Sequence, residues 1–229
     1  MATAAAEPLL TDLKRIFKER LRSVVTYGEP GANRSVHALV LVATLGADDL
    51  DACAAASHRW HRDGLATPLI LPEQEFRRSL DAFPLEYSEI QRAHQHVFGS
   101  NPFDGLSIAP EDLRRACETQ VKSHLVHLRE GYIEAAGHPQ VIAELVEASA
   151  AGFAALLRNV ARLYGVNIND RTAATHEGAR LAALPEDVVA AVLALEHSQS
   201  LPSTDPARLF PRYLAAVEQL AAWIDSWRP

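Results

Sequence analysis

The chain has 229 residues, of which 48% are hydrophobic and 22% charged, so it can form one large globular domain or two small ones. Its formal net charge of −7 argues against a protein whose main task is to hold nucleic acid, because that task needs a basic face. Cys53 and Cys117 form no C-x-x-C pair and predict neither a disulfide framework nor a zinc site. The longest apolar stretch, 38–47, is too short to span a membrane, and the first ten residues lack the pattern of a signal peptide. We therefore expect a cytoplasmic protein.

The first hundred residues alternate between helical and strand-like segments. An amphipathic helix is expected over 9–22, and a second over 47–64, which begins with acidic residues and ends at a glycine. Valine-rich segments with nearly continuous apolar character are typical of strands that are covered on both faces. Segments with a strand pattern occur at 23–27, 36–44, 67–72 and 85–91. This half is predicted to be a small mixed sheet backed by helices.

Strand patterns disappear after residue 108, where apolar residues keep helical spacing. Helices are expected over 109–137, 139–165, 171–183, 186–198 and 205–227. The predicted fold class is therefore α+β, with an α/β domain at 1–105 and a helical bundle domain at 106–229. The alanine-rich helices present small side chains that can pack closely against another helix. We expect a homodimer or a protein partner to bind through this half.

The stretch VVTYGEPGANRSVHALVLV, residues 24–42, places a glycine turn between two strands. With the helix, strands and helical bundle that follow, it resembles the nucleotidyltransferase superfamily that includes DNA polymerase beta. The similarity covers roughly residues 9–100 and is greatest to the small bacterial nucleotidyltransferases with a helical C-terminal domain. The resemblance implies a Gly-Ser turn that holds a triphosphate and an Asp-x-Asp pair at the start of the next strand. Residues two apart on a strand share a face, so both carboxylates can hold magnesium ions.

The sequence departs from the family pattern at the positions that the resemblance assigns to the site. Ser35 and His37 stand where the two aspartates belong, and Gly28-Glu29 replaces Gly-Ser. Serine and neutral histidine do not supply the anionic oxygen ligands that magnesium requires, and Glu29 would repel a phosphate. We therefore expect a pseudoenzyme that has no catalytic metal site, needs no cofactor and binds nucleotide weakly or not at all. It would serve as a binding or regulatory module, and no catalytic residue is assigned.

Two enzymatic alternatives remain open. An active nucleotidyltransferase would need magnesium and acids recruited from Glu29, Asp48 or Asp49 to move a nucleotidyl group from a nucleoside triphosphate to a small molecule or protein. The Arg-x4-His spacing of Arg171 and His176 is similar to that of the HEPN ribonucleases, in which the arginine holds phosphate and the histidine assists acid–base chemistry.

Several of the ten histidines occur in closely spaced pairs, which suggests a metal site. The pairs are His58 with His61, His94 with His96, and His124 with His127, and His37 could complete a site of three. No glutamate motif accompanies any pair. We interpret these histidines as polar surface residues.

Overall fold

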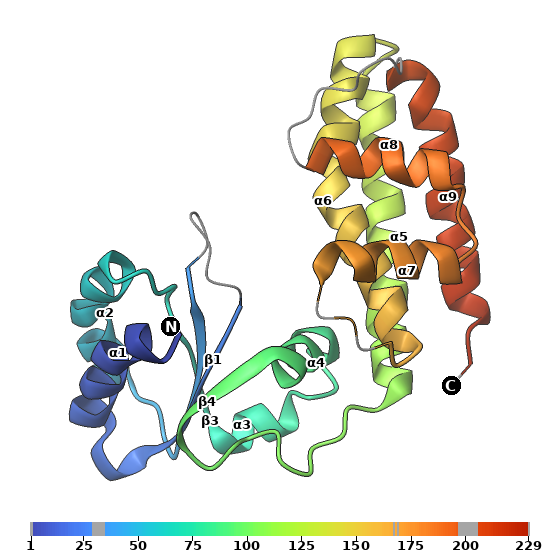
Figure 1. Cartoon of the computed structure of the whole chain (residues 1–229). Coiled ribbons are helices and arrows are strands. Elements are labelled where there is room, and N and C mark those ends of the chain that lie inside the picture. The colour runs from blue at the N-terminus through green and yellow to red at the C-terminus, as the bar shows by residue number, and fades with distance from the viewer. Residues whose placement is uncertain (1, 29–34, 167, 169, 197–205, 229) are drawn as a thin grey trace. The chain divides into compact units, whose positions relative to one another are not determined.

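The computed structural model describes residues 2–28, 35–166, 168, 170–196 and 206–228. The chain divides into two compact units, Met1–Ala109 and Pro110–Pro229. The division follows Ala109, whereas the sequence pattern places it after residue 105. The fold class is α+β, as predicted, with a small mixed sheet followed by helices (Figure 1).

The first unit is built on a sheet of four strands in the order β3-β2-β1-β4 (Figure 1). Its strands are β1 (Leu21–Tyr27), β2 (His37–Val42), β3 (Leu69–Pro72) and β4 (His94–Gly99). The central strand β1 is antiparallel to both β2 and β4, and β2 is parallel to β3. The parallel pair requires a crossover, and the helix over 47–62 provides it.

Helices cover both faces of this sheet, which explains why its central strands carry nearly continuous apolar runs at 24–25 and 38–42. On one face, α1 (Ala2–Phe17) and α2 (Ala47–Arg62) pack against alternate residues of β1 and β2. On the other face, α3 (Glu73–Arg78) and α4 (Pro84–Ala93) enclose a core that contains Val25. These two cores fix which side chains of β1 and β2 face each pair of helices.

The strand predicted near 85–91 is wrong, because this segment forms the helix α4. Pro84 occupies its first turn, and Tyr87 and Ile90 are three residues apart and both buried, as one face of a helix requires. The fourth strand is β4, whose HQHVFG sequence lacks an apolar run because it lies at the edge of the sheet and is only partly buried.

The first helix also ends earlier than the predicted residue 22. α1 stops at Phe17, and a single 3-10 turn, η1 (Lys18–Arg20), leads into β1. Lys18 has a φ of +50°, which breaks the helical path. Leu21, which fits the helical spacing, belongs instead to the first strand and is buried there.

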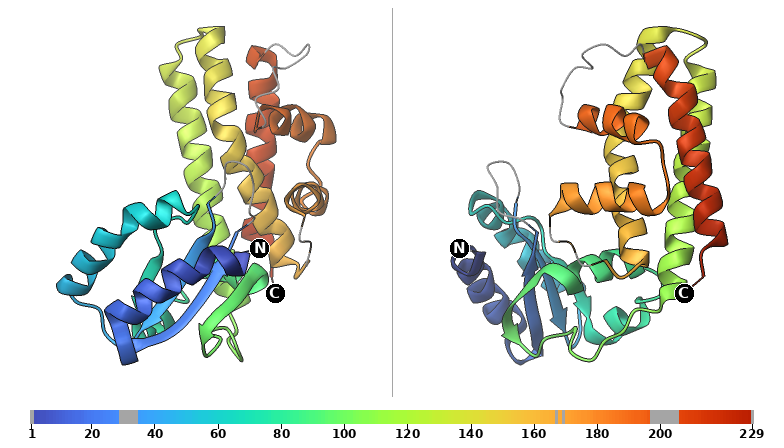
Figure 2. Two further views of the ribbon diagram at one scale, coloured as in Figure 1. Left: turned by 60° about the vertical axis from the view of Figure 1, so that its left-hand side comes forward. Right: turned by 45° about the vertical axis from the view of Figure 1, so that its right-hand side comes forward.

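The second unit consists of helices and the turns between them and has no strand among its described residues, as predicted. Its helices are α5 (Pro110–Glu134), α6 (Pro139–Leu163), α7 (Arg171–Leu181), α8 (Glu186–Glu196) and α9 (Pro206–Ser226). Figures 1 and 2 show α5, α6 and α9 running alongside one another, while α7 and α8 cross them. α6 packs against each of the other four helices. By length and composition alone, α6 is also apolar enough to cross a membrane. The buried core helix of a folded domain meets the same criterion.

Candidate functional site

The glycine turn that the resemblance assigns to triphosphate binding begins where β1 ends. Gly28 has a φ of +91°, a conformation that favours glycine, and a Cβ atom there would lie 3.3 Å from Cδ2 of His37. Tyr27 and His37 are register partners on β1 and β2, so the two strands meet at this end. Glu29 lies outside the described residues, and the expectation about its charge stays a prediction.

Ser35 and His37 share one side of the strand that leads into β2. Val36, between them, is buried among α1 and α2 residues, and its N–H donates to the Gly64 carbonyl at 3.0 Å. Because side chains alternate along a strand, Ser35 and His37 project to the opposite face, toward the α3 and α4 side. Both residues are exposed. The structure thus places the two residues at the assigned acid positions on one accessible face.

The His37 ring stacks on Tyr27, with ring centroids 5.4 Å apart and an angle of 23° between the planes. Burial raises the pKa of the Tyr27 phenol, and the negative charge of Glu89 raises it further. Glu89 comes from α4, which the sequence pattern predicts as a strand, so sequence reasoning missed this acid. A helical prediction for 84–93 would have placed Tyr87 and Ile90 on the buried face and left Glu89 outside the core, where its charge could be recognised.

Asp48 and Asp49, two of the acids named for an active nucleotidyltransferase, lie at the end of the sheet remote from the glycine turn. They begin α2, which follows the last residue of β2, whereas His37 is its first residue. The six residues of β2 separate the two ends by roughly 20 Å. Asp49 accepts two hydrogen bonds from Arg20, each 2.7 Å long, and one of 3.0 Å from the Gly46 N–H. These bonds, above all those from Arg20, lower the pKa of Asp49 to about 2. Asp48 and Asp49 therefore do not lie beside the glycine turn, and of the three acids named for an active enzyme only Glu29 follows that turn directly.

The histidines within the described ranges do not gather into a metal site. In the part of the chain that the structure describes, no three His, Cys, Asp or Glu side chains come close enough to hold a metal ion. His94 is opposite Tyr27 on β4, but its Nδ1 faces the Gln91 carbonyl at 2.9 Å and its Nε2 faces Asn101 Oδ1 at 3.1 Å. His124 contacts Tyr213 inside the helical unit. The residues present at the assigned acid positions, a hydroxyl and an imidazole, do not fit magnesium.

Arg171 and His176 lie on the same short helix but do not converge. Asp170 Oδ1 accepts a hydrogen bond of 2.6 Å from the Ala173 N–H, so it caps α7 as the sequence predicts. Arg171 is then the first residue of α7, and both it and His176 are exposed. Five positions on an α-helix turn the side chain by about 140° beyond a full turn. The two side chains therefore leave α7 in different directions.

Comparison with solved structures finds a similar fold over nearly the full length of the chain. The crystal structure of spectinomycin adenyltransferase AAD(9) from Enterococcus faecialis with ATP and spectinomycin matches with a TM-score of 0.59 and 12% sequence identity. The match covers 97% of this chain and 99% of that chain. No family model and no curated protein matches the sequence. At this identity the likeness concerns the fold, and the chain has a nucleotidyltransferase-like fold with a helical C-terminal part.

Proposed function

We propose that the chain is a nucleotidyltransferase-fold protein without a catalytic metal site, and that it acts as a binding or regulatory module. The observation that carries this proposal is the pairing of Ser35 with His37 on the accessible face beside Gly28. His37 is also stacked on Tyr27, so its ring covers part of the face where an acid would hold a metal ion.

The chemistry of nucleotidyl transfer explains why this pairing is decisive. Such transfer depends on magnesium ions that neutralise the triphosphate and orient the attacking oxygen, and these ions prefer carboxylate ligands. Asp49 near β2 is engaged by Arg20, and Asp12 of α1 is buried against Arg59 and Trp60. These acids stabilise the fold and are unavailable for a metal.

Thermal unfolding with magnesium and each common nucleoside triphosphate tests the proposal. A ligand at about a hundred times its Kd stabilises the folded state by about 2.7 kcal/mol, so binding would raise the melting temperature. We expect no rise for the unaltered protein. The double variant Ser35→Asp, His37→Asp should gain a rise that depends on magnesium. The variant Ser57→Asp, His58→Asp makes the same changes on α2 and should gain none.

A clear rise in the unaltered protein that Gly28→Val abolishes would refute the proposal, because it would show that the glycine turn still holds nucleotide. Gly28 lies in the left-handed region, so a β-branched residue there distorts the turn.

One observation favours an active nucleotidyltransferase as the second candidate. The negative charge of Glu89 adds to burial in raising the pKa of the Tyr27 phenol, which places a carboxylate on the same side of the sheet as His37. The adenyltransferase with the similar fold was crystallised with ATP and a small molecule, which suggests the reaction class. Under this candidate, the unaltered protein transfers a nucleotidyl group to a small molecule and Glu89→Gln abolishes the transfer. Retention of the transfer by Glu89→Gln would count against this use of Glu89.

The helical unit supports an interaction role. Ile133 of α5 is 76% exposed, Val126 lies two turns earlier on the same face, and Val141 is near the start of α6. Exposed apolar side chains of this kind favour contact with another surface. We propose that they form a homodimer contact.

Light scattering coupled to gel filtration tests the dimer. The unaltered protein should elute as a dimer, and Ile133→Glu should elute as a monomer because it places a charge in the contact. Leu50→Glu changes an equally apolar exposed residue of α2 and should remain a dimer. A monomer at high concentration of the unaltered protein would refute the contact.

A further inference from the structure

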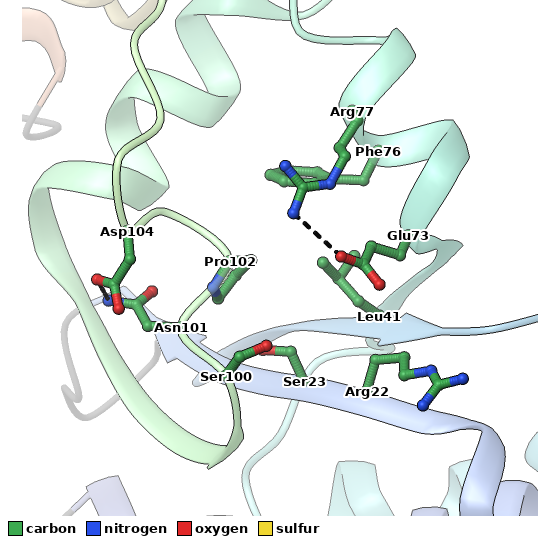
Figure 3. Close-up of a pocket in the computed structure, with 10 residues that line it drawn as sticks. All are labelled: Arg22, Ser23, Leu41, Glu73, Phe76, Arg77, Ser100, Asn101, Pro102 and Asp104. Atoms are coloured by element: carbon green, nitrogen blue, oxygen red, sulfur yellow. Dashed lines mark hydrogen bonds and ion pairs between the residues drawn. The ribbon is translucent and has the colours of Figure 1, made fainter.

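A cavity of about 120 Å³ opens beside the first residues of β1, at the end remote from Gly28 (Figure 3). Arg22 and Ser23 of β1 form one wall, Glu73 and Arg77 of α3 a second, and residues 100–104 after β4 a third. The seven residues of β1 place this cavity roughly 20 Å from the glycine turn. It is therefore separate from the site that the family resemblance indicates.

One oxygen of each carboxylate in the cavity walls accepts a hydrogen bond from the protein. Glu73 Oε1 accepts a hydrogen bond of 3.1 Å from Arg77, as Figure 3 shows. Asp104 Oδ1 accepts one of 2.9 Å from the Asn101 amide, and Asn101 Oδ1 accepts one of 3.1 Å from the Phe103 N–H. The two carboxylates in the walls are therefore each engaged by a protein donor, and Arg22, Ser23 and Arg77 bring further donors to the lining.

The donors include a buried hydroxyl that has no partner. Ser23 is 2% exposed, and its Oγ makes no hydrogen bond to any residue that the structure describes. A buried polar group without a partner destabilises a fold, so each case calls for an explanation. Arg22 beside it has no ion pair or hydrogen bond within the described parts of the chain, and Arg77 keeps N–H donors that Glu73 does not use.

We propose that this cavity binds a small oxyanion, either a phosphate or a carboxylate group, with Arg22, Ser23 and Arg77 as the donors. A guanidinium fork matches the oxygen atoms of such groups and binds them more strongly than neutral donors do. The buried Ser23 hydroxyl supplies a donor whose position is fixed by β1. Leu41 and Phe76 form an apolar part of the lining, which limits the space to a small group.

Thermal unfolding with inorganic phosphate, and separately with sodium acetate, tests the proposal when ionic strength is held constant with sodium chloride. At least one anion should raise the melting temperature saturably, and the one that does identifies the oxyanion. Arg22→Gln should weaken the apparent Kd about tenfold or more, because it removes a charged hydrogen bond. Arg78→Gln alters the next arginine of α3, which does not line the cavity, and should bind as the unaltered protein does.

Ser23→Ala separates ligand binding from a structural role. Without anion this variant should melt at a higher temperature than the unaltered protein, since it removes a buried hydroxyl that has no partner. With anion its rise in melting temperature should be smaller. A saturable rise with neither anion, or an equal rise in Arg22→Gln and Arg78→Gln, would overturn the proposal. The assay contains no magnesium or nucleotide, so its result is independent of the proposed function.

Discussion

The α/β unit and the helical unit stabilise their buried polar groups in different ways. In the α/β unit, Asp12 of α1 is 7% exposed and accepts hydrogen bonds from Arg59, at 2.7 and 2.8 Å, and from Trp60 Nε1, at 3.0 Å. Burial alone would raise the pKa of Asp12, but the hydrogen bonds from Arg59, Trp60 and Arg15 lower it below its usual value. This carboxylate stays charged and joins α1 to α2.

In the helical unit, the corresponding interior group is a neutral histidine. His124 Nε2 lies 2.7 Å from the Tyr213 hydroxyl, and Ser149 Oγ lies 3.1 Å from the same oxygen. Burial lowers the pKa of His124 to about 4, and the charge of nearby His127 contributes. The imidazole is therefore uncharged at neutral pH and can accept a hydrogen bond from the Tyr213 hydroxyl.

The difference shows where each unit is sensitive. The α/β unit depends on charged pairs between elements, which is why Asp12 and Asp49 are not free for metal chemistry. The helical unit depends on close helix contacts and an uncharged interior, so extra volume and extra protons should weaken it. The following substitutions test this comparison.

The largest expected effect comes from adding volume where α7 crosses α6. A Cβ atom on Gly178 would lie 1.8 Å from the Leu157 carbonyl oxygen, so the two helices would have to separate. Gly178→Val should lower the free energy of unfolding by about 3 kcal/mol or more. Urea unfolding followed by far-UV circular dichroism measures this loss. Ala173→Val, at an exposed position of α7, should have a small effect, and equal losses in the two variants would contradict the close contact.

Asp12→Ala should have the next largest effect, confined to the α/β unit. It leaves the Trp60 N–H without its acceptor and Arg59 without its ion pair. Because Arg59 is half exposed and can be hydrated, we expect a loss of about 2 kcal/mol in the free energy of unfolding. Asp51→Ala removes an exposed acid of α2 and should cost less than about 0.5 kcal/mol. Similar urea midpoints for both variants would show that the buried pair is unimportant.

Acid should weaken the helical unit through His124. Its pKa is about 4 when folded and 6.5 ordinarily, so the unfolded chain takes up the proton first as pH falls. The stability that His124 contributes is complete above pH 6.5 and is lost progressively toward pH 4. Allowing for partial exposure, the loss should be about 1 to 2 kcal/mol.

The variant His124→Gln, which does not titrate, should show correspondingly less loss between pH 6.5 and pH 4. Urea unfolding at a series of pH values compares the two proteins. His176→Gln changes an exposed histidine of the same unit and should behave as the unaltered protein does. An unchanged pH dependence in His124→Gln would exclude His124 as the source.

The smallest effect is expected at the adjacent acids of α2. Asp49→Asn weakens the bonds to Arg20 and the Gly46 N–H, and the pair is partly exposed, so a loss of about 0.5 to 1 kcal/mol is expected. Asp48→Asn changes an exposed neighbour in the same first turn and should cost less. Chemical unfolding of the two variants side by side measures the difference. If Asp48→Asn costs more, the bond between Asp49 and Arg20 does not stabilise the contact of η1 with α2.

The fold class and most elements could be predicted because their signals are local. In the helical half, apolar spacing, Pro110, Pro139 and the Asp170 cap define where helices begin. β1 and β2 could be predicted from their valine-rich apolar runs, and β3 from a short apolar run bounded by prolines. The segment 84–93 could not, because its short apolar alternation fits either a strand or a helix, and only packing against β1 and β2 selects the helix.

At the candidate site, the sequence alone determined that Ser35 and His37 occupy the positions that the family resemblance assigns to acids, since strand alternation and the apolar run of β2 fix their place. Only the tertiary structure decided that Asp49 binds Arg20, that Glu89 acts on Tyr27, and that the Ser23 hydroxyl lines a cavity without a partner. Local periodicity depends on residues within a few positions of one another. These contacts join residues far apart in the chain, and their geometry is set by how helices pack on the sheet.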